Sequence, residues 1–433
     1  MSGRRGSSPR RPQIQRQTES TSPRVIVWLQ WTAIRSRRAA DGQCRVSSQV
    51  PLFLWKHFDV GSGLSTMLNW LLQHVLPLAE QGEPAAAGDS RVYLTARTAG
   101  AALMAFVAAV LVGPLAIRFL KRRFRERIDS ASDRLNELHA TKQETPTMGG
   151  LFILAAIVCV TLLFGDWSSS CVQIALFVTL GFGGIGAVDD WIKLKGKKRG
   201  LSARQKLFAQ LTLGAITGYW LYVTQRDLPS GTALVSPLGE GALALGWWFI
   251  PWSMLVMAAT SNGVNLTDGL DGLAGGTVML CAVAVAALTY IAGHHELAQY
   301  FHVPFQRGAG EFTIVLGAMV GAVLGFLWFN CHPAEVFMGD TGSLPLGALL
   351  AVGGLVARQE LLLIIIGGVF VVEVLSVILQ IGCYKLFGRR IIACSPLHNH
   401  FLFRGMHETK IVTRFWICGA LLAILGVASL KFR

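Results

Sequence analysis

Apolar runs of about 20 residues recur along most of this 433-residue chain. A helix needs about that many apolar residues to cross the hydrocarbon core of a bilayer. The sequence therefore predicts an all-α, polytopic membrane protein with about ten transmembrane helices. Composition supports this class, because 52% of the residues are hydrophobic and only 15% are charged, whereas soluble domains carry about 25% charged residues. The predicted spans lie near residues 97–120, 149–166, 171–190, 207–225, 243–263, 272–293, 312–330, 342–357, 361–384 and 411–430.

Positive charges mark one set of loops between these runs. The basic loops are the segments 121–128 and 193–206 and the region after the ninth run, whereas the opposite loops hold few Lys or Arg residues. The positive-inside rule places the basic loops in the cytoplasm and both ends of the helical body on the periplasmic side. We therefore attribute the net charge of +14 to membrane orientation and expect no nucleic-acid partner.

Residues 1–66 differ from the rest of the chain. They begin with a segment rich in Arg, Ser and Pro, a composition that cannot form a hydrophobic core. The apolar stretch 26–32 (VIVWLQW) is too short to span a membrane, and no signal-peptide cleavage pattern follows it. We interpret residues 1–66 as a disordered basic extension, or as a mis-called start upstream of Met67. Residues 67–433 are then the membrane domain.

Polar residues are rare in the apolar body and gather at four places. Each place follows the third, fifth, seventh or ninth run, and these runs cross the membrane in the same direction. The four groups should therefore meet at the cytoplasmic face. The groups are Asp189 and Asp190; Asn262, Asn265, Asp268 and Asp271; Asn330, Glu335 and Asp340; and His398, Asn399, His400 and His407.

The chemistry of these groups indicates a site for a metal ion and phosphate. Carboxylates at a membrane edge are costly and usually functional, and several together repel one another unless a cation intervenes. Carboxylate and amide oxygens suit Mg²⁺, which commonly fills its remaining positions with water and phosphate oxygens. Lys142, Lys193 and Lys206 lie in the facing loops, where they could neutralise phosphate charge.

Each group taken alone also has a purely structural interpretation. Asp189 and Asp190 could form a solvated helix end beside Lys193, and residues 265–276 could form a polar turn. His398 and His400 could form a weak zinc site, although no third ligand has the usual spacing. Glu373, inside the ninth run, is interpreted as a packed structural acid. A site becomes the better interpretation because all four groups are predicted on one membrane face.

Five motifs occur in a definite order: KQETPTMGG (142–150), DDWIK (189–193), NLTDGLDGLAGG (265–276), WFNCHPAEVFMGDTGSLPLG (328–347) and PLHNHF…RFWI (396–417). Together they resemble the motifs of the phospho-N-acetylmuramoyl-pentapeptide transferases, a branch of the polyprenyl-phosphate N-acetylhexosamine-1-phosphate transferases. The similarity covers about residues 67–433. It implies a bacterial inner-membrane enzyme whose active site faces the cytoplasm.

The resemblance also implies roles for individual residues. Asp340 would be a metal ligand, with Asp268 as a second. Four positions depart from the family pattern. Asn399 replaces the usual middle His, Leu402 replaces a frequent Glu, and Gln143 and Glu144 replace the usual pair before TPTMGG. The implied catalytic residues are Asp189, Asp190, Asp340, His398 and His400. The implied substrate-binding residues are Lys142, Thr147, Lys193, Lys206, Asn265, Asp268, Asp271, Asn330 and Phe337.

The implied reaction transfers phospho-MurNAc-pentapeptide from UDP-MurNAc-pentapeptide to undecaprenyl phosphate, with Mg²⁺, giving lipid I and UMP. Asp189 is expected to position or deprotonate the lipid phosphate, and Asp190 to support the metal network. A two-step route through a carboxylate nucleophile stays open. The alternatives are a sister transferase using UDP-GlcNAc and an ion-coupled transporter. Gly-rich faces permit a homodimer in the bilayer.

Overall fold

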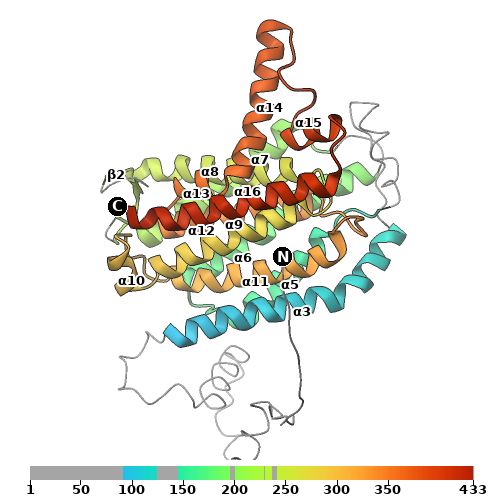
Figure 1. Cartoon of the computed structure of the whole chain (residues 1–433). Coiled ribbons are helices and arrows are strands. Elements are labelled where there is room, and N and C mark those ends of the chain that lie inside the picture. Colours follow the sequence, from blue (N-terminus) through green and yellow to red (C-terminus); the bar gives the residue numbers. More distant parts are fainter. Residues whose placement is uncertain (1–90, 124–144, 196–199, 229, 237–240, 433) are drawn as a thin grey trace, which may run out of the picture. The chain divides into compact units, whose positions relative to one another are not determined.

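The computed structural model describes residues 91–123, 145–195, 200–228, 230–236 and 241–432 (Figure 1). The extension 1–66 and Lys142 lie outside the described residues. The helices are α3 (Arg91–Arg123), α5 (Gly150–Phe164), α6 (Ser170–Leu194), α7 (Ala203–Gln225), α8 (Phe249–Thr267), α9 (Leu273–Ala292), α10 (His295–Tyr300), α11 (Ala309–Asn330), α12 (Asp340–Ala357), α13 (Leu362–Ile366), α14 (Gly368–Phe387), α15 (Leu397–Phe403) and α16 (Glu408–Ser429). Two short strands, β1 (Ala233–Val235) and β2 (Ala242–Ala244), pair antiparallel.

Every predicted apolar run overlaps at least one helix, which confirms the helical class. Among the described residues, seven helices are long and apolar enough to cross a membrane: α3, α6, α9, α11, α12, α14 and α16. Helix α5 is apolar but shorter, and α7 and α8 are not among the seven. The ninth run is divided at Gly367 into α13 and α14. The count of ten spans and the periplasmic position of both ends stay predictions.

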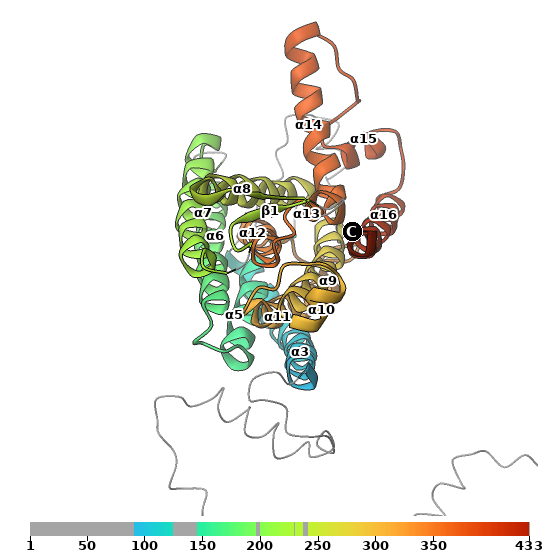
Figure 2. The ribbon, with the colours of Figure 1, turned by 90° about the vertical axis from the view of Figure 1, so that its left-hand side faces the viewer.

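Helix α12 lies at the centre of the helical body. All of its residues are buried, and it packs against α5, α6, α8 and α9, which surround it in Figure 2. Helices α6 and α12 approach very closely at Gly186, where a Cβ atom would collide with the backbone carbonyl of Asp340. Because glycine has no side chain, this contact brings the end of α6 against the start of α12.

Helix α14 extends away from the neighbouring helices, as Figure 1 shows. Only its first part is buried, at Gly368, Val369, Phe370 and Glu373. Its later residues expose large apolar side chains, among them Ile378, Leu379, Leu386 and Phe387. Exposed apolar surface on this scale is costly in water and is favourable in contact with lipid.

Candidate active site

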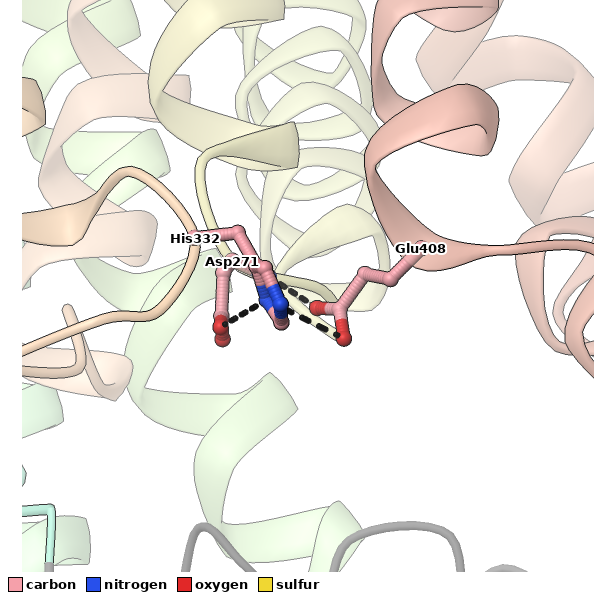
Figure 3. A group of neighbouring side chains, drawn as sticks. All are labelled: Asp271, His332 and Glu408. Atoms are coloured by element: carbon pink, nitrogen blue, oxygen red, sulfur yellow. Dashed lines mark hydrogen bonds and ion pairs between the residues drawn. The ribbon is translucent and has the colours of Figure 1, made fainter.

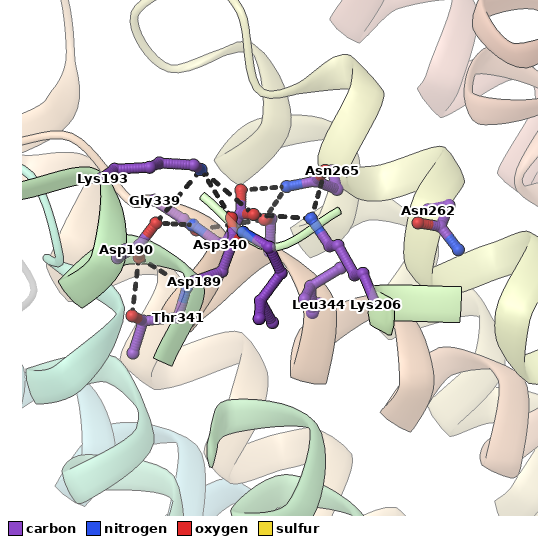
Figure 4. A network of polar contacts seen from close by, with 12 residues as sticks. Asp189, Asp190, Lys193, Lys206, Asn262, Asn265, Gly339, Asp340, Thr341 and Leu344 are labelled. Atoms are coloured by element: carbon purple, nitrogen blue, oxygen red, sulfur yellow. Dashed lines mark hydrogen bonds and ion pairs between the residues drawn. The ribbon is translucent and has the colours of Figure 1, made fainter. Parts of the chain in front are cut away.

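The contact between α6 and α12 brings three predicted acids together. Asp189 and Asp190 lie in the last turns of α6, and Asp340 is the first residue of α12. Each is buried, and the three offer carboxylate oxygens within 4.8 Å of one another. The convergence expected from the alternation of the runs is therefore confirmed for these residues (Figure 4).

Asp190 caps the amino end of α12. Its carboxylate accepts hydrogen bonds from the backbone N–H of Asp340 at 3.2 Å and of Thr341 at 2.9 Å. The Thr341 hydroxyl donates a third bond at 2.7 Å. The first N–H groups of a helix have no partner within the helix, and the helix dipole favours a negative charge there. Asp190 thus anchors α12 in the position that presents Asp340.

Asp189 shares Lys193 with Asp190 but makes none of the capping contacts with α12. Its carboxylate accepts a hydrogen bond from the backbone N–H of Leu201 at 2.6 Å and lies 2.8 Å from Lys193 Nζ. Adjacent residues on a helix project about 100° apart, so the two acids cannot form one bidentate clamp. The observed contacts agree with divided roles for the pair.

Two lysines neutralise part of the charge of the acidic cluster. Lys193 Nζ lies 3.2 Å from Asp340 and 3.5 Å from Asp190, in addition to its contact with Asp189. Lys206, at the start of α7, places Nζ 2.6 Å from Asp340 Oδ2. Three carboxylates face two ammonium groups within this cluster. Its hard oxygen donors and remaining negative charge fit a divalent cation such as Mg²⁺.

Asn265, near the end of α8, joins Lys206 to α12. Its Nδ2 donates to Asp340 Oδ1 at 2.7 Å and to Ser343 Oγ at 2.9 Å. Its Oδ1 accepts from Lys206 Nζ at 3.3 Å. Asn262, from the same predicted group, pairs instead with Gln210 at 2.7 Å and lies apart from the acids in Figure 4.

Asp268 follows α8 and is partly buried. Burial and the negative charges of Asp340 and Asp190 raise the pKa of its carboxyl, and Lys193 partly offsets the rise, so that the pKa is about 7. Asp268 is not one of the three carboxylates that meet within 4.8 Å. Its role as a second metal ligand stays a prediction.

Asp271 belongs to a second cluster, with His332 and Glu408 (Figure 3). Asp271 Oδ2 lies 3.0 Å from His332 Nδ1 and accepts a hydrogen bond from the backbone N–H of Ala334 at 3.2 Å. Glu408 Oε1 accepts from the backbone N–H of Asp271 at 2.7 Å. The three side chains offer ligand atoms within 4.8 Å, but their mutual hydrogen bonds and ion pairs already account for this geometry.

The loop before α5 lies against the loop before α12. Phe337 donates its backbone N–H to the Pro146 carbonyl at 2.8 Å, and Gly149 donates to the Phe337 carbonyl at 2.8 Å. Thr147 is buried beside Gly339, where a Cβ atom would lie 3.0 Å from Thr147 Oγ1 and 2.7 Å from Asp190 Oδ2. The predicted residues Thr147 and Phe337 therefore adjoin the acidic cluster.

The two predicted catalytic histidines have different surroundings. His398 is buried, its Nδ1 lies 3.2 Å from Glu373 Oε1, and its Nε2 faces Gly269 so closely that a Cβ atom there would collide with it. Glu373 also accepts from the backbone N–H of Leu397 at 2.7 Å, which agrees with a supporting role. His400 Nδ1 instead accepts from the backbone N–H of Ala393 at 3.1 Å.

Four residues of these clusters were not predicted as site residues: His332, Thr341, Ser343 and Glu408. Thr341 and Ser343 stand inside the motif MGDTGS, so their position next to Asp340 was an available signal. His332 and Glu408 are 76 residues apart, as 408 − 332, and nothing in their spacing indicates that they meet.

Comparisons of the sequence with known proteins identify the family. The profile of "Glycosyl transferase family 4" matches residues 172–358, and "Phospho-N-acetylmuramoyl-pentapeptide-transferase signature 1" matches residues 142–154. The phospho-N-acetylmuramoyl-pentapeptide-transferase of Pelobacter propionicus is 45% identical over 355 residues, 80% of this chain and 98% of the relative. The protein of the same name from Citrifermentans bemidjiense is 46% identical over 344 residues, 79% of this chain and 94% of the relative. The chain therefore belongs to the phospho-N-acetylmuramoyl-pentapeptide-transferase family.

Proposed function

We propose that this protein transfers phospho-MurNAc-pentapeptide from UDP-MurNAc-pentapeptide to undecaprenyl phosphate, forming lipid I and UMP for peptidoglycan synthesis. The observation that carries the proposal is the placement of Asp340. At the start of α12, the Asp340 carboxylate contacts two lysine ammonium groups and the side-chain amide of Asn265. Such a set can hold a pyrophosphate and a cation together. We place the site at the cytoplasmic side of the bacterial inner membrane.

The reaction is a phosphoryl transfer that needs alignment and charge neutralisation. A phosphate oxygen of the lipid forms a bond to the β-phosphorus of the nucleotide. The bond from that phosphorus to the bridging oxygen breaks, and UMP leaves with the electron pair. Lys193 and Lys206 are the protein cations that would stabilise the charge developing on the leaving group. Asp189, free of the capping contacts that occupy Asp190, would position or deprotonate the lipid phosphate.

Asp340 would hold Mg²⁺, with Asp268 as the second proposed ligand. When bound, the ion supplies Lewis-acid stabilisation of pyrophosphate oxygens. Asp190 would act indirectly, by fixing the α12 terminus from which Asp340 projects. Lys142, Thr147, Asn265, Asp271, Asn330 and Phe337 are proposed to line the nucleotide site, and His398 and His400 to complete the catalytic loop.

The decisive assay measures UMP release by the purified protein with undecaprenyl phosphate and Mg²⁺. One reaction contains UDP-MurNAc-pentapeptide and a parallel one contains UDP-GlcNAc. We expect release with the first nucleotide and little with the second. Release with UDP-GlcNAc alone would assign the sister transferase activity, and no release with either nucleotide would overturn the proposal.

A further inference from the structure

The turn between α8 and α9 is held from three directions by side chains from other parts of the chain. The turn includes Asp271 and Gly272, and Gly272 has a positive φ of 78°. Asn330 Oδ1 accepts from the backbone N–H of Gly272 at 3.0 Å, and Trp416 Nε1 donates to the Gly272 carbonyl at 3.2 Å. A backbone turn with both of its polar groups bonded to side chains is fixed in position.

Asp271 itself is held at both ends. Glu408 Oε1 accepts its backbone N–H at 2.7 Å, while His332 Nδ1 and the Ala334 N–H both engage Oδ2. With one oxygen held by two partners, the carboxylate plane has little freedom to rotate. The Asp271 side chain is only 2% exposed, so this orientation is set by the protein and not by solvent.

Glu408 is the first residue of α16, the last long helix, and a negative charge is favourable in that first turn. Its second oxygen, Oε2, lies 3.7 Å from the same His332 nitrogen that contacts Asp271. His332 therefore stands between the two carboxylates and contacts both. Figure 3 shows the imidazole between Asp271 and Glu408.

We propose that Glu408 is a positioning residue, which together with His332 fixes Asp271 in the orientation that receives the nucleotide part of the substrate. The inference rests on the proposed function, in which Asp271 belongs to the nucleotide site. A polar group that is already held in its binding orientation binds a ligand more tightly, because it loses little conformational entropy on binding. Loss of Glu408 should weaken nucleotide binding and leave the lipid site and the chemical step in place.

The main test compares Glu408→Ala with Glu408→Gln. Glutamine keeps a carbonyl oxygen that can accept the Asp271 N–H, whereas alanine does not. We expect Glu408→Ala to raise KM for UDP-MurNAc-pentapeptide about tenfold, the value of one hydrogen bond. KM for undecaprenyl phosphate and kcat should stay within about twofold of the wild-type values. Glu408→Gln should keep a nucleotide KM close to that of the wild type. Thr409→Ala, at the exposed neighbouring position, is the matched control.

Binding of UMP to the detergent-solubilised protein, measured by calorimetry, separates the two proposals. If the wild type binds UMP but produces no UMP from either nucleotide sugar, the proposed function fails. The UMP affinities of the wild type and of Glu408→Ala can still be compared, and this comparison tests the role of Glu408. If the wild type is active and Glu408→Ala keeps its nucleotide KM, or raises both KM values equally, the positioning role is overturned. Should Glu408→Ala fail to fold, His332→Ala decides. This side chain is 41% exposed, and an unchanged UMP affinity would reject the inference.

Discussion

Helix α12 carries a buried group of charges at each end, and the two groups differ in composition. At its start, Asp340 meets two other carboxylates and two lysines from α6 and α7. Beyond its end, the buried Arg358 lies 3.5 Å from Glu360 and donates to Gln225. The Arg358 guanidinium also lies 4.2 Å from the centre of the Phe249 ring.

The difference lies in charge balance and in the origin of the partners. At the Arg358 end, one cation faces one anion two residues away, and an aromatic ring covers the cation. At the Asp340 end, acids from separate helices outnumber the lysines. Buried ion pairs alone are therefore weak evidence of function. Excess charge of one sign, assembled from distant parts of the chain, indicates a site that is completed by a ligand.

The comparison predicts the largest effect at Asp340. Asp340→Asn removes the carboxylate that would hold Mg²⁺ beside the two lysines, and we expect UMP release to fall about 1000-fold because the transition state would lose the stabilisation that the ion supplies. The protein should still insert into membranes at the wild-type level. Asp227→Asn, at a side chain that is 88% exposed, is the control. Near-normal turnover of Asp340→Asn would remove Asp340 from the reaction.

The next largest effect is expected at Lys206. Lys206→Gln keeps a hydrogen-bond donor near Asp340 but removes the positive charge, so kcat should fall about 100-fold. Steady-state kinetics at saturating lipid and nucleotide would measure this change. Arg204→Gln loses the same charge at an exposed position on the same helix turn and should leave kcat unaltered. Equal losses in both variants would show a general charge effect.

Buried ion pairs in which one cation faces one anion should affect the stability of the protein and not its turnover. Arg97 on α3 contacts Glu311 on α11 through two bonds, of 2.7 and 3.0 Å, and the Phe164 carbonyl at 3.0 Å. Arg97→Met should lower the free energy of unfolding by about 2 kcal/mol, because Glu311 and the carbonyl lose a shared partner. Thermal unfolding in detergent measures the loss, with the exposed Arg118→Met as control. A fall in the turnover of folded Arg97→Met would contradict the distinction between ion pairs that stabilise the fold and charges that act in the reaction.

The most gradual expected effect is a pH dependence of stability at Glu360. Burial raises the pKa of this carboxyl to about 7, and the charge of Arg358 partly opposes the rise. The unfolded chain then ionises at lower pH than the folded one, so stability should decrease between about pH 5 and 7 and stay level above. The slope would be at most about 1.4 kcal/mol per pH unit. Between about pH 5 and 7, the free energy of unfolding should depend less on pH for Glu360→Gln than for the wild type. Identical slopes for the two proteins would show that Glu360 is not the group responsible.

Much of the acidic cluster around Asp340 was predictable from the sequence. The lengths of the apolar runs locate the helices, and the common direction of alternate runs predicts that Asp189, Asp190, Asp340 and Asn265 approach one another. The capping of α12 by Asp190 was not predictable, because it depends on the close contact at Gly186. The partners of Asp271 were not predictable either, since they depend on where α16 packs. The break at Gly367 likewise lies within a run whose hydropathy is continuous.

The contact at Gly186 limits how this protein can change. Exposed apolar positions on α14 can exchange one large side chain for another, because a lipid tail adapts to either. At Gly186, even a methyl group must displace the backbone of Asp340, and the displaced atoms belong to the residue that would bind the metal. In a library of random substitutions, this position should therefore accept no replacement without loss of activity, although it bears no functional group.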